Sequence, residues 1–311
     1  MSSFRMNRRE FIGAIGAAAF AAVVANTRAA ESPSLTPSGM QKRAIPSSGE
    51  QLPVIGMGTS GTFDVGATEA ERAPLVEVLR LLFDGGGSLI DTAPSYGRAE
   101  TVIGDLLQQG GWRQRAFLAT KISAGAGAGA RTQWNGSLAR LRSDKVDLLQ
   151  VHNLVDWREN LAFLRELKQA GQVRYVGVTH YLDHAHDELA RIVRAERIDF
   201  VQLNYSAATR SAEKRLLPLC KERGVAVLVN RAFEDGRLFD TVHGREVPAW
   251  AAEIDCRSWA QLFLKFVLAN PAVTAVIPAT SKARHMLDNL GAGLGTVADA
   301  KYQDRIAALV S

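Results

Sequence analysis

The stretch GGSLIDTAPSYGRAE, residues 86–100, indicates the fold more clearly than any other part of the chain. Its short apolar run is typical of a buried strand and ends at Asp91. Pro94 and Gly97 break regular structure, so a loop carrying Tyr96 should follow, and a helix after it. An acid at a strand end with a tyrosine on the next loop is expected at the mouth of an α/β barrel, where loops after the strands carry the chemistry.

Two later apolar segments end in the same way. One closes on Lys121 and the next closes on His152. Three consecutive predicted strands therefore each end in a titratable side chain, and parallel strands bring their carboxyl ends to one edge. We interpret Asp91, Lys121, His152 and the loop residue Tyr96 as parts of one site.

From residue 42 onward, short apolar segments alternate with amphipathic ones. The predicted strands cover residues 54–59, 88–91, 117–121, 146–152, 173–178, 200–204, 225–229 and 273–277. The predicted helices cover residues 69–83, 101–108, 132–141, 157–169, 188–195, 212–223, 256–269 and 283–290. Such alternation requires parallel pairing with right-handed crossovers. Eight units in about 250 residues favour one (β/α)8 TIM barrel, and residues 43–53 predict a short β-hairpin before it.

The composition is that of an ordinary globular protein, with 311 residues, 47% hydrophobic and 22% charged. The formal net charge is +5, and residues 1–30 contribute most of it through four arginines and one glutamate. The remainder is nearly balanced and has no basic tract. A nucleic-acid partner is therefore not expected.

The first thirty residues resemble a bacterial twin-arginine (Tat) signal peptide. Arg8 and Arg9 precede a mildly apolar run over residues 11–25, and small residues follow. We predict a signal peptide over 1–30, a linker over 31–41 and the barrel over 42–311. The Tat machinery would then be a partner and the periplasm the destination.

A membrane anchor is the alternative reading of the same segment, but a spanning helix needs about 20 apolar residues and this run is shorter. We therefore expect no stable membrane insertion after cleavage. If export is inefficient, the protein would act in the cytoplasm. Because Tat moves folded proteins, a tightly bound cofactor could be acquired before export.

Several other features are assigned to structure rather than chemistry. Cys220 and Cys256 are read as inert thiols, with one disulfide as the alternative. The GAGAGA segment, residues 125–130, lacks the spacing of a dinucleotide fingerprint and is read as a flexible active-site loop. His184 and His186 are read as a solvated helix start, and no metal site is predicted.

The residues at the three strand ends suit proton delivery to a carbonyl oxygen. A tyrosine is a useful acid only if its pKa falls from about 10, and a nearby ammonium such as Lys121 favours the phenolate. Asp91 would hold that lysine, and His152 would orient the carbonyl. The chain has no nucleophile elbow and no metal cluster in its sequence, and hydride from a bound nicotinamide would supply the missing reactant.

These motifs resemble the aldo-keto reductase family. IDTAPSYGRAE is similar to the family motif DTAxxYGxxE, and ATKI and LLQVHN are similar to its lysine and histidine strands. VRYVGVTH, VQLNYSAATRSAE, GVAVLVNRAFEDGRLF and ANPAVTAVIPATSKARHMLDN follow in the family's order. The resemblance implies reduction of an aldehyde or ketone, or the reverse, with Tyr96 as proton donor. It implies a catalytic tetrad of Asp91, Tyr96, Lys121 and His152.

The resemblance also implies NADPH, with NADH possible, bound without a Rossmann domain. It places these residues at the cofactor: Thr59, Asp91, Thr179, His180, Gln202, Asn230, Arg231, Gly236, Leu238, Thr280, Ser281, Lys282 and Asn289. Thr179, His180 and Gln202 would hold the carboxamide, and residues 230–238 would pass the pyrophosphate. The adenosine end would meet Thr280, Ser281, Lys282 and Asn289, and Lys282 with Arg284 would offer charge to a 2′-phosphate.

Three positions depart from the family pattern. Thr179-His180 replaces the usual Ser-Asn, and Asn230 followed by Arg231 stands where an aromatic ring commonly stacks on the nicotinamide. His285 replaces an arginine found in some relatives. The alternative function is a nicotinamide-binding barrel with little turnover that senses redox state, because the periplasm keeps no known supply of free NADPH to recycle the cofactor. The substrate, a small carbonyl compound, is not identified by the sequence.

Overall fold

The computed structural model describes residues 39–310. Its main sheet is parallel, and the order of its strands follows the sequence from β3 to β10. The strands are β3 (Met57–Gly58), β4 (Leu89–Asp91), β5 (Phe117–Ile122), β6 (Val146–His152), β7 (Val173–Thr179), β8 (Phe200–Asn204), β9 (Ala226–Asn230) and β10 (Ala275–Val276). Bridges from Ile55 to Val276 and from Gly58 to Ala279 join the first strand to the last. The (β/α)8 prediction is confirmed.

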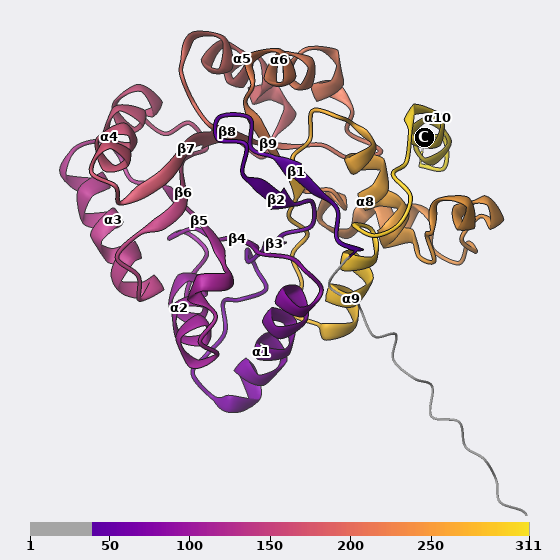
Figure 1. Cartoon of the computed structure of the whole chain (residues 1–311), viewed down its shortest axis with the longest axis horizontal. Helices are drawn as coiled ribbons and strands as arrows, with labels where there is room; N and C mark the ends of the chain where they lie inside the picture. Colours follow the sequence, from indigo (N-terminus) through magenta and orange to yellow (C-terminus); the bar gives the residue numbers. More distant parts are fainter. Residues whose placement is uncertain (1–38, 311) are drawn as a thin grey trace, which may run out of the picture. The chain divides into compact units, whose positions relative to one another are not determined.

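Helices form a ring outside the strands (Figure 1). They are α1 (Glu69–Asp84), α2 (Ala99–Gln109), α3 (Ala128–Leu141), α4 (Trp157–Gln169), α5 (His186–Ala195), α6 (Leu216–Arg223), α7 (Arg237–Thr241), α8 (Trp259–Ala269), α9 (Ala283–Gly291) and α10 (Ala300–Ala307). Two of these helices, α7 and α10, were not predicted from the sequence. No helix in the described part of the chain is long and apolar enough to cross a membrane.

Strand periodicity decides which side chains enter the barrel. On β5, Phe117 and Ala119 belong to the apolar cluster inside the barrel, whereas Leu118 and Ile122 pack against the helices. Because successive side chains of a strand point to opposite faces, Lys121 lies on the same inward face as Phe117 and Ala119. The same alternation places six polar residues on the inward faces of their strands: Asp91 on β4, Gln150 and His152 on β6, Thr179 on β7, Gln202 on β8 and Asn230 on β9.

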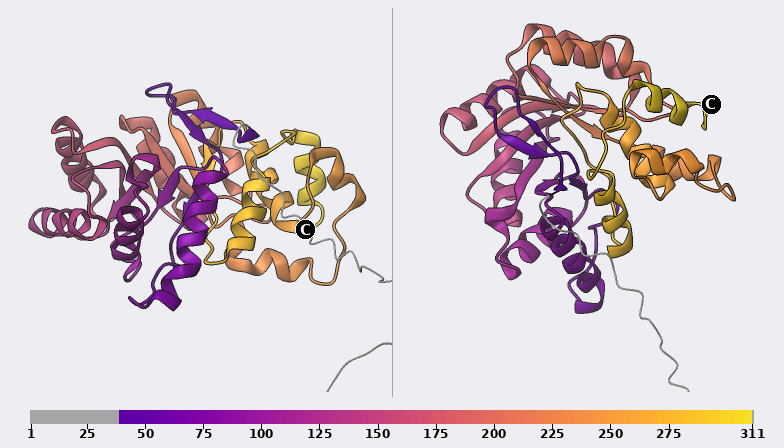
Figure 2. Two further views of the ribbon diagram at one scale, coloured as in Figure 1. Left: turned by 60° about the horizontal axis from the view of Figure 1, so that its bottom comes forward. Right: turned by 45° about the vertical axis from the view of Figure 1, so that its right-hand side comes forward.

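A short hairpin covers the amino ends of the strands. It consists of β1 (Lys42–Ala44) and β2 (Gln51–Pro53), which pair antiparallel as predicted. Ile45 and Leu52 at its inner side are fully buried in the cluster inside the barrel. Figures 1 and 2 show the hairpin, in indigo, lying across this opening. One end of the barrel is therefore closed.

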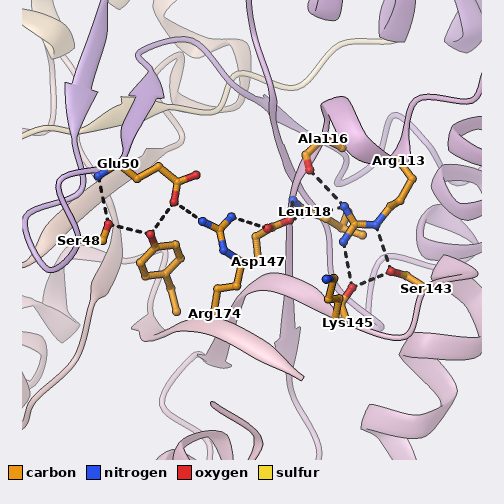
Figure 3. Close-up of polar contacts among 10 residues, drawn as sticks. Ser48, Glu50, Arg113, Ala116, Leu118, Ser143, Lys145, Asp147 and Arg174 are labelled. Carbon is orange, nitrogen blue, oxygen red and sulfur yellow. Dashed lines mark hydrogen bonds and ion pairs between the residues drawn. The ribbon is translucent and has the colours of Figure 1, made fainter. Parts of the chain in front are cut away.

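Polar contacts fasten the hairpin to the strands (Figure 3). Glu50 accepts a hydrogen bond from the Tyr175 hydroxyl at 2.6 Å. It also accepts a hydrogen bond from Arg174, with which it forms an ion pair. Arg174 in turn donates to Asp147 Oδ1 at 2.8 Å, and Asp147 Oδ2 accepts from the backbone N–H of Leu118 at 2.8 Å. These contacts link the hairpin to β5, β6 and β7.

Several local predictions need correction. The predicted signal peptide and residues 31–38 lie outside the described residues, but Met40 is buried in the core and the Gln41 N–H donates to Gly293 O at 2.9 Å. The end of the predicted linker is therefore part of the fold. Residues 128–130 of the GAGAGA segment form the first turn of α3, because Gly127 with φ +81° allows the chain to turn just before it.

The structure corrects the prediction for His186 and agrees with the prediction for the two cysteines. His186 is buried rather than solvated: its Nε2 lies 3.0 Å from Asn204 Oδ1 and its Nδ1 lies 3.1 Å from Ser211 Oγ. A partner on β8 gives this histidine a packing role. Cys220 and Cys256 are both buried free thiols, which agrees with the inert reading.

Candidate active site

The tetrad predicted from the sequence comes together at the carboxyl ends of the strands. Lys121 Nζ donates to Asp91 Oδ2 at 2.6 Å and to Thr92 O at 2.9 Å, and both charged side chains are buried. The same ammonium lies 5.0 Å from the centroid of the Tyr96 ring. The Tyr96 and His152 rings meet edge to face at 5.8 Å.

Burial acts to lower the pKa of Lys121, but the Asp91 carboxylate and then Tyr96 act in the opposite direction. The net result is a pKa above the ordinary value for lysine. Lys121 is thus an ammonium that is shielded from water and positioned below the tyrosine ring. Such a group stabilises a phenolate formed when the tyrosine gives up its proton.

His152 is an uncharged imidazole at physiological pH. Burial, the nearby Lys121 charge and His180 lower the pKa of His152 to about 3. Its Nδ1 lies 3.4 Å from the Ser95 hydroxyl. A neutral imidazole carries one N–H, which is available to a carbonyl oxygen in the cavity if the proton is on Nε2.

The second oxygen of Asp91 is held by two amides. Gln202 Nε2 donates to Asp91 Oδ1 at 2.9 Å, and Gln150 Nε2 lies 3.4 Å from the same oxygen. Gln150 is buried, and its backbone is paired with Lys121 on the neighbouring strand. Gln150 was not predicted as a site residue, although its place two residues before His152 puts it on the same face of β6.

A chain of hydrogen bonds continues from the tetrad toward β9. Gln202 Oε1 accepts from Thr179 Oγ1 at 3.2 Å and from Asn230 Nδ2 at 3.3 Å. Asn230 Oδ1 is buried and has no partner among the described residues. Thr59 Oγ1 donates to Asp91 O at 3.1 Å from the opposite side. Most of these polar side chains are thus held in place by the protein itself.

The tetrad opens into a cavity of about 980 Å³. Nine of the predicted cofactor residues line it: Thr59, Asp91, Thr179, Gln202, Asn230, Arg231, Gly236, Thr280 and Asn289. Tyr96 and His152 line it as well, whereas Lys121 lies beneath the surface with no exposure. This volume is at the upper end of the range of about 300–1,000 Å³ that is usual for small-molecule and cofactor sites.

Four predicted cofactor residues do not line this cavity: His180, Leu238, Ser281 and Lys282. His180 turns back on its own loop, where its Nδ1 accepts from the Leu182 N–H at 3.2 Å and its ring stacks on Tyr181. Leu238 is buried in the core, and the Lys282 N–H donates to Thr280 Oγ1 at 3.0 Å. Lys282 itself is exposed.

Several aromatic residues of the cavity were not predicted. They are Tyr181, Phe233, Phe239 and Trp259. Arg231 lies 5.5 Å above the Tyr181 ring and forms an ion pair with Asp235, so the loops after β7 and β9 touch each other. Tyr181 and Phe233 lie in loops, Phe239 lies in α7 and Trp259 begins α8. Strand periodicity could therefore not identify these residues.

The residues present fit a nicotinamide cofactor. Thr179, Gln202 and Asn230 form a hydrogen-bonded group at the tetrad end of the cavity, and Asn230 Oδ1 is a buried acceptor without a donor among the described residues. A carboxamide carries such N–H donors. The fold and site together are those of a barrel oxidoreductase that uses a nicotinamide.

Comparisons with known proteins agree with this class. The model of the aldo/keto reductase family matches residues 54–310. Methylglyoxal reductase YeaE of Escherichia coli is 32% identical over 260 residues, covering 80% of this chain and 89% of the relative. Aldo-keto reductase YhdN of Bacillus subtilis is 30% identical over 208 residues, covering 61% of each chain. The chain therefore belongs to the aldo/keto reductase family.

Solved structures show the same fold. An aldo/keto reductase from Klebsiella pneumoniae, solved with NADP and acetate, is 26% identical, with a TM-score of 0.74 over 87% of this chain and 95% of its own. The holo form of an aldo-keto reductase from Bacillus halodurans is 25% identical, with a TM-score of 0.70 over 88% of this chain and 97% of its own.

Proposed function

We propose that this protein is an NADPH-dependent reductase of small aldehydes or ketones. The observation that carries the proposal is the buried Lys121–Asp91 pair below Tyr96, with the neutral His152 beside it at the end of the cavity. When bound, NADPH supplies the hydride for the carbonyl carbon. The carbonyl oxygen takes the Tyr96 hydroxyl proton, so the product is an alcohol.

Each member of the tetrad has a separate role in this proposal. Tyr96 gives the proton, and Lys121 stabilises the phenolate that remains. Asp91 keeps Lys121 charged and in place. His152 donates its N–H to the carbonyl oxygen and so fixes the substrate beside Tyr96.

Two relatives suggest the first substrate to test. YeaE is named a methylglyoxal reductase, and an NADH-specific methylglyoxal reductase of Escherichia coli is 27% identical over 228 residues, covering 61% of this chain and 68% of the relative. We propose a 2-oxoaldehyde as the first carbonyl compound to assay. The second of these relatives is the reason to test NADH beside NADPH.

Replacing Tyr96 with Phe tests the function. The purified protein should bind NADPH in a fluorescence titration, and loss of nicotinamide absorbance should follow addition of methylglyoxal. Tyr96→Phe should lower turnover at least a hundredfold, because it removes the proton donor, and should leave NADPH binding within about twofold. Turnover above a tenth of wild type would remove Tyr96 from the acid role. Tight binding without turnover of any carbonyl would favour the redox sensor.

We also propose Tat-dependent export to the periplasm through residues 1–30. Arg8 and Arg9 before an apolar run support this proposal. Cell fractionation should find a mature form without residues 1–30 in the periplasm. Replacing both arginines with Lys should keep the protein in the cytoplasm. A full-length cytoplasmic form in wild-type cells would favour the cytoplasmic alternative.

A further inference from the structure

Asn230 occupies the position where the family commonly has an aromatic ring. Its amide side chain can accept and donate hydrogen bonds, which an aromatic ring that stacks on the nicotinamide does not do. It lines the cavity at the end of β9 and reaches the tetrad through Gln202. Its Oδ1 is buried with no partner among the described residues. We propose that Asn230 Oδ1 accepts a hydrogen bond from the carboxamide N–H of the nicotinamide, an inference that rests on the function proposed above.

The orientation of the Asn230 amide follows from its neighbours. Asp91 pairs with the Lys121 ammonium through Oδ2 and accepts at Oδ1, so Gln202 must direct its donor Nε2 toward Oδ1. Gln202 Oε1 then faces Asn230, which must donate through Nδ2. Asn230 Oδ1 is left as the free acceptor. The opposite orientation of the Asn230 amide, with O and N exchanged, is excluded by this chain of contacts.

Gln202 is not a suitable acceptor for the carboxamide. Its Oε1 already receives hydrogen bonds from Thr179 and Asn230, which use both of its lone pairs. His180, the other residue expected here, faces the Leu182 N–H outside the cavity lining. Asn230 therefore takes over the accepting role at this end of the cavity.

The unpartnered atom also distinguishes Asn230 from other polar residues. Among the described residues, six buried side-chain N or O atoms lack a hydrogen-bond partner. Of the six residues that carry these atoms, only Asn230 lines the cavity. A buried acceptor without a donor is costly, so a ligand that supplies an N–H is favoured over one that does not.

A binding experiment with an altered cofactor tests the proposal. Reduced 3-acetylpyridine adenine dinucleotide phosphate carries a methyl group in place of the carboxamide nitrogen, so it lacks these N–H donors and keeps the carbonyl. Calorimetry on the wild-type protein should show NADPH binding about tenfold more tightly than the analogue. Asn230→Ala should bind both within about twofold of each other. Asn230→Asp, which keeps an acceptor, should retain the preference even if both ligands bind more weakly.

Asn270→Ala is the matched control. Asn270 lies outside the cavity lining, and its Oδ1 accepts from the Ala272 N–H at 3.0 Å. This variant should keep the wild-type preference. An unchanged preference in Asn230→Ala, or equal binding of both ligands by wild type, would overturn the role of Asn230 and leave the reductase intact. Absence of NADPH binding by wild type would overturn both proposals.

Discussion

The two ends of the barrel interior are built from different chemistry. At the site end, where the strands terminate, inward positions are polar and include a buried ion pair. At the hairpin end, inward positions are apolar, with Phe117, Tyr175 and Phe200 in mutual ring contact and Ile45 inserted among them. The same strands thus supply apolar packing at one end and buried polar and charged groups at the other.

The difference lies in how polar atoms are satisfied. At the site end, Asp91 receives hydrogen bonds from Lys121 and Gln202, deep in the structure. At the hairpin end, the charged side chains of Glu50 and Arg174 are partly exposed at the surface, and the interior is apolar. Changes at the site end should therefore alter activity, whereas changes at the hairpin end should alter stability alone.

The largest effect should follow removal of the buried cation. Lys121→Met leaves the Asp91 carboxylate buried without its counter-charge, which should cost about 3 kcal/mol of unfolding free energy. Turnover should fall more than a hundredfold. Denaturant unfolding and steady-state kinetics measure the two effects.

A double variant separates charge from packing at this pair. Asp91→Asn combined with Lys121→Met should recover most of the lost unfolding free energy, because neither charge is then buried alone. Turnover should stay low. If the double variant were as unstable as the single one, the loss would come from packing and not from the unpaired carboxylate.

At the hairpin end, Ile45→Ala should destabilise without inactivating. The side chain is fully buried in the barrel interior, and its truncation should cost about 3 kcal/mol. Under conditions where the variant stays folded, kcat should match wild type within about twofold. A large fall in kcat would show that the two ends are coupled.

The pH dependence of stability should reveal the buried imidazole at the site end. Since His152 has a folded pKa of about 3, well below the ordinary 6.5, the unfolded chain binds its proton first as the pH falls. Stability should be full above pH 6.5 and be lost below it, by up to about 1.4 kcal/mol per pH unit until the pH approaches 3. The melting temperature of His152→Asn should fall less steeply than that of wild type between pH 6.5 and 4. Parallel curves would contradict a depressed pKa.

The smallest effect should come from the exposed contacts of the hairpin end. Arg174→Met removes the ion pairs to Glu50 and Asp147, but the arginine side chain is 45% exposed. Such pairs contribute at most about 1 kcal/mol, and Asp147 keeps its contact with the Leu118 N–H. The unfolding free energy should fall by no more than that amount, with unchanged kinetics. A loss of unfolding free energy above about 2 kcal/mol would show that the ion pairs of Arg174 stabilise the hairpin more than exposed pairs usually do.

The sequence by itself determined the barrel and identified the four residues that we propose as its tetrad. Strand–helix alternation limits the topology, and a two-residue period assigns Lys121 and His152 to the inward face once the strands are known. Both signals are local. The hairpin was predicted from its turn residues for the same reason.

Only the tertiary structure decided how the polar groups pair. Gln150 and Gln202 reach Asp91 through contacts between strands that are far apart in sequence. His180 turns onto its own loop, where it accepts from the Leu182 N–H. The start of α3 depends on the turn at Gly127, and the aromatic lining of the cavity comes from loops and helix ends outside the strand pattern. Hydrogen bonds and side-chain orientations are set by neighbours in space, and those neighbours exist only after the barrel closes.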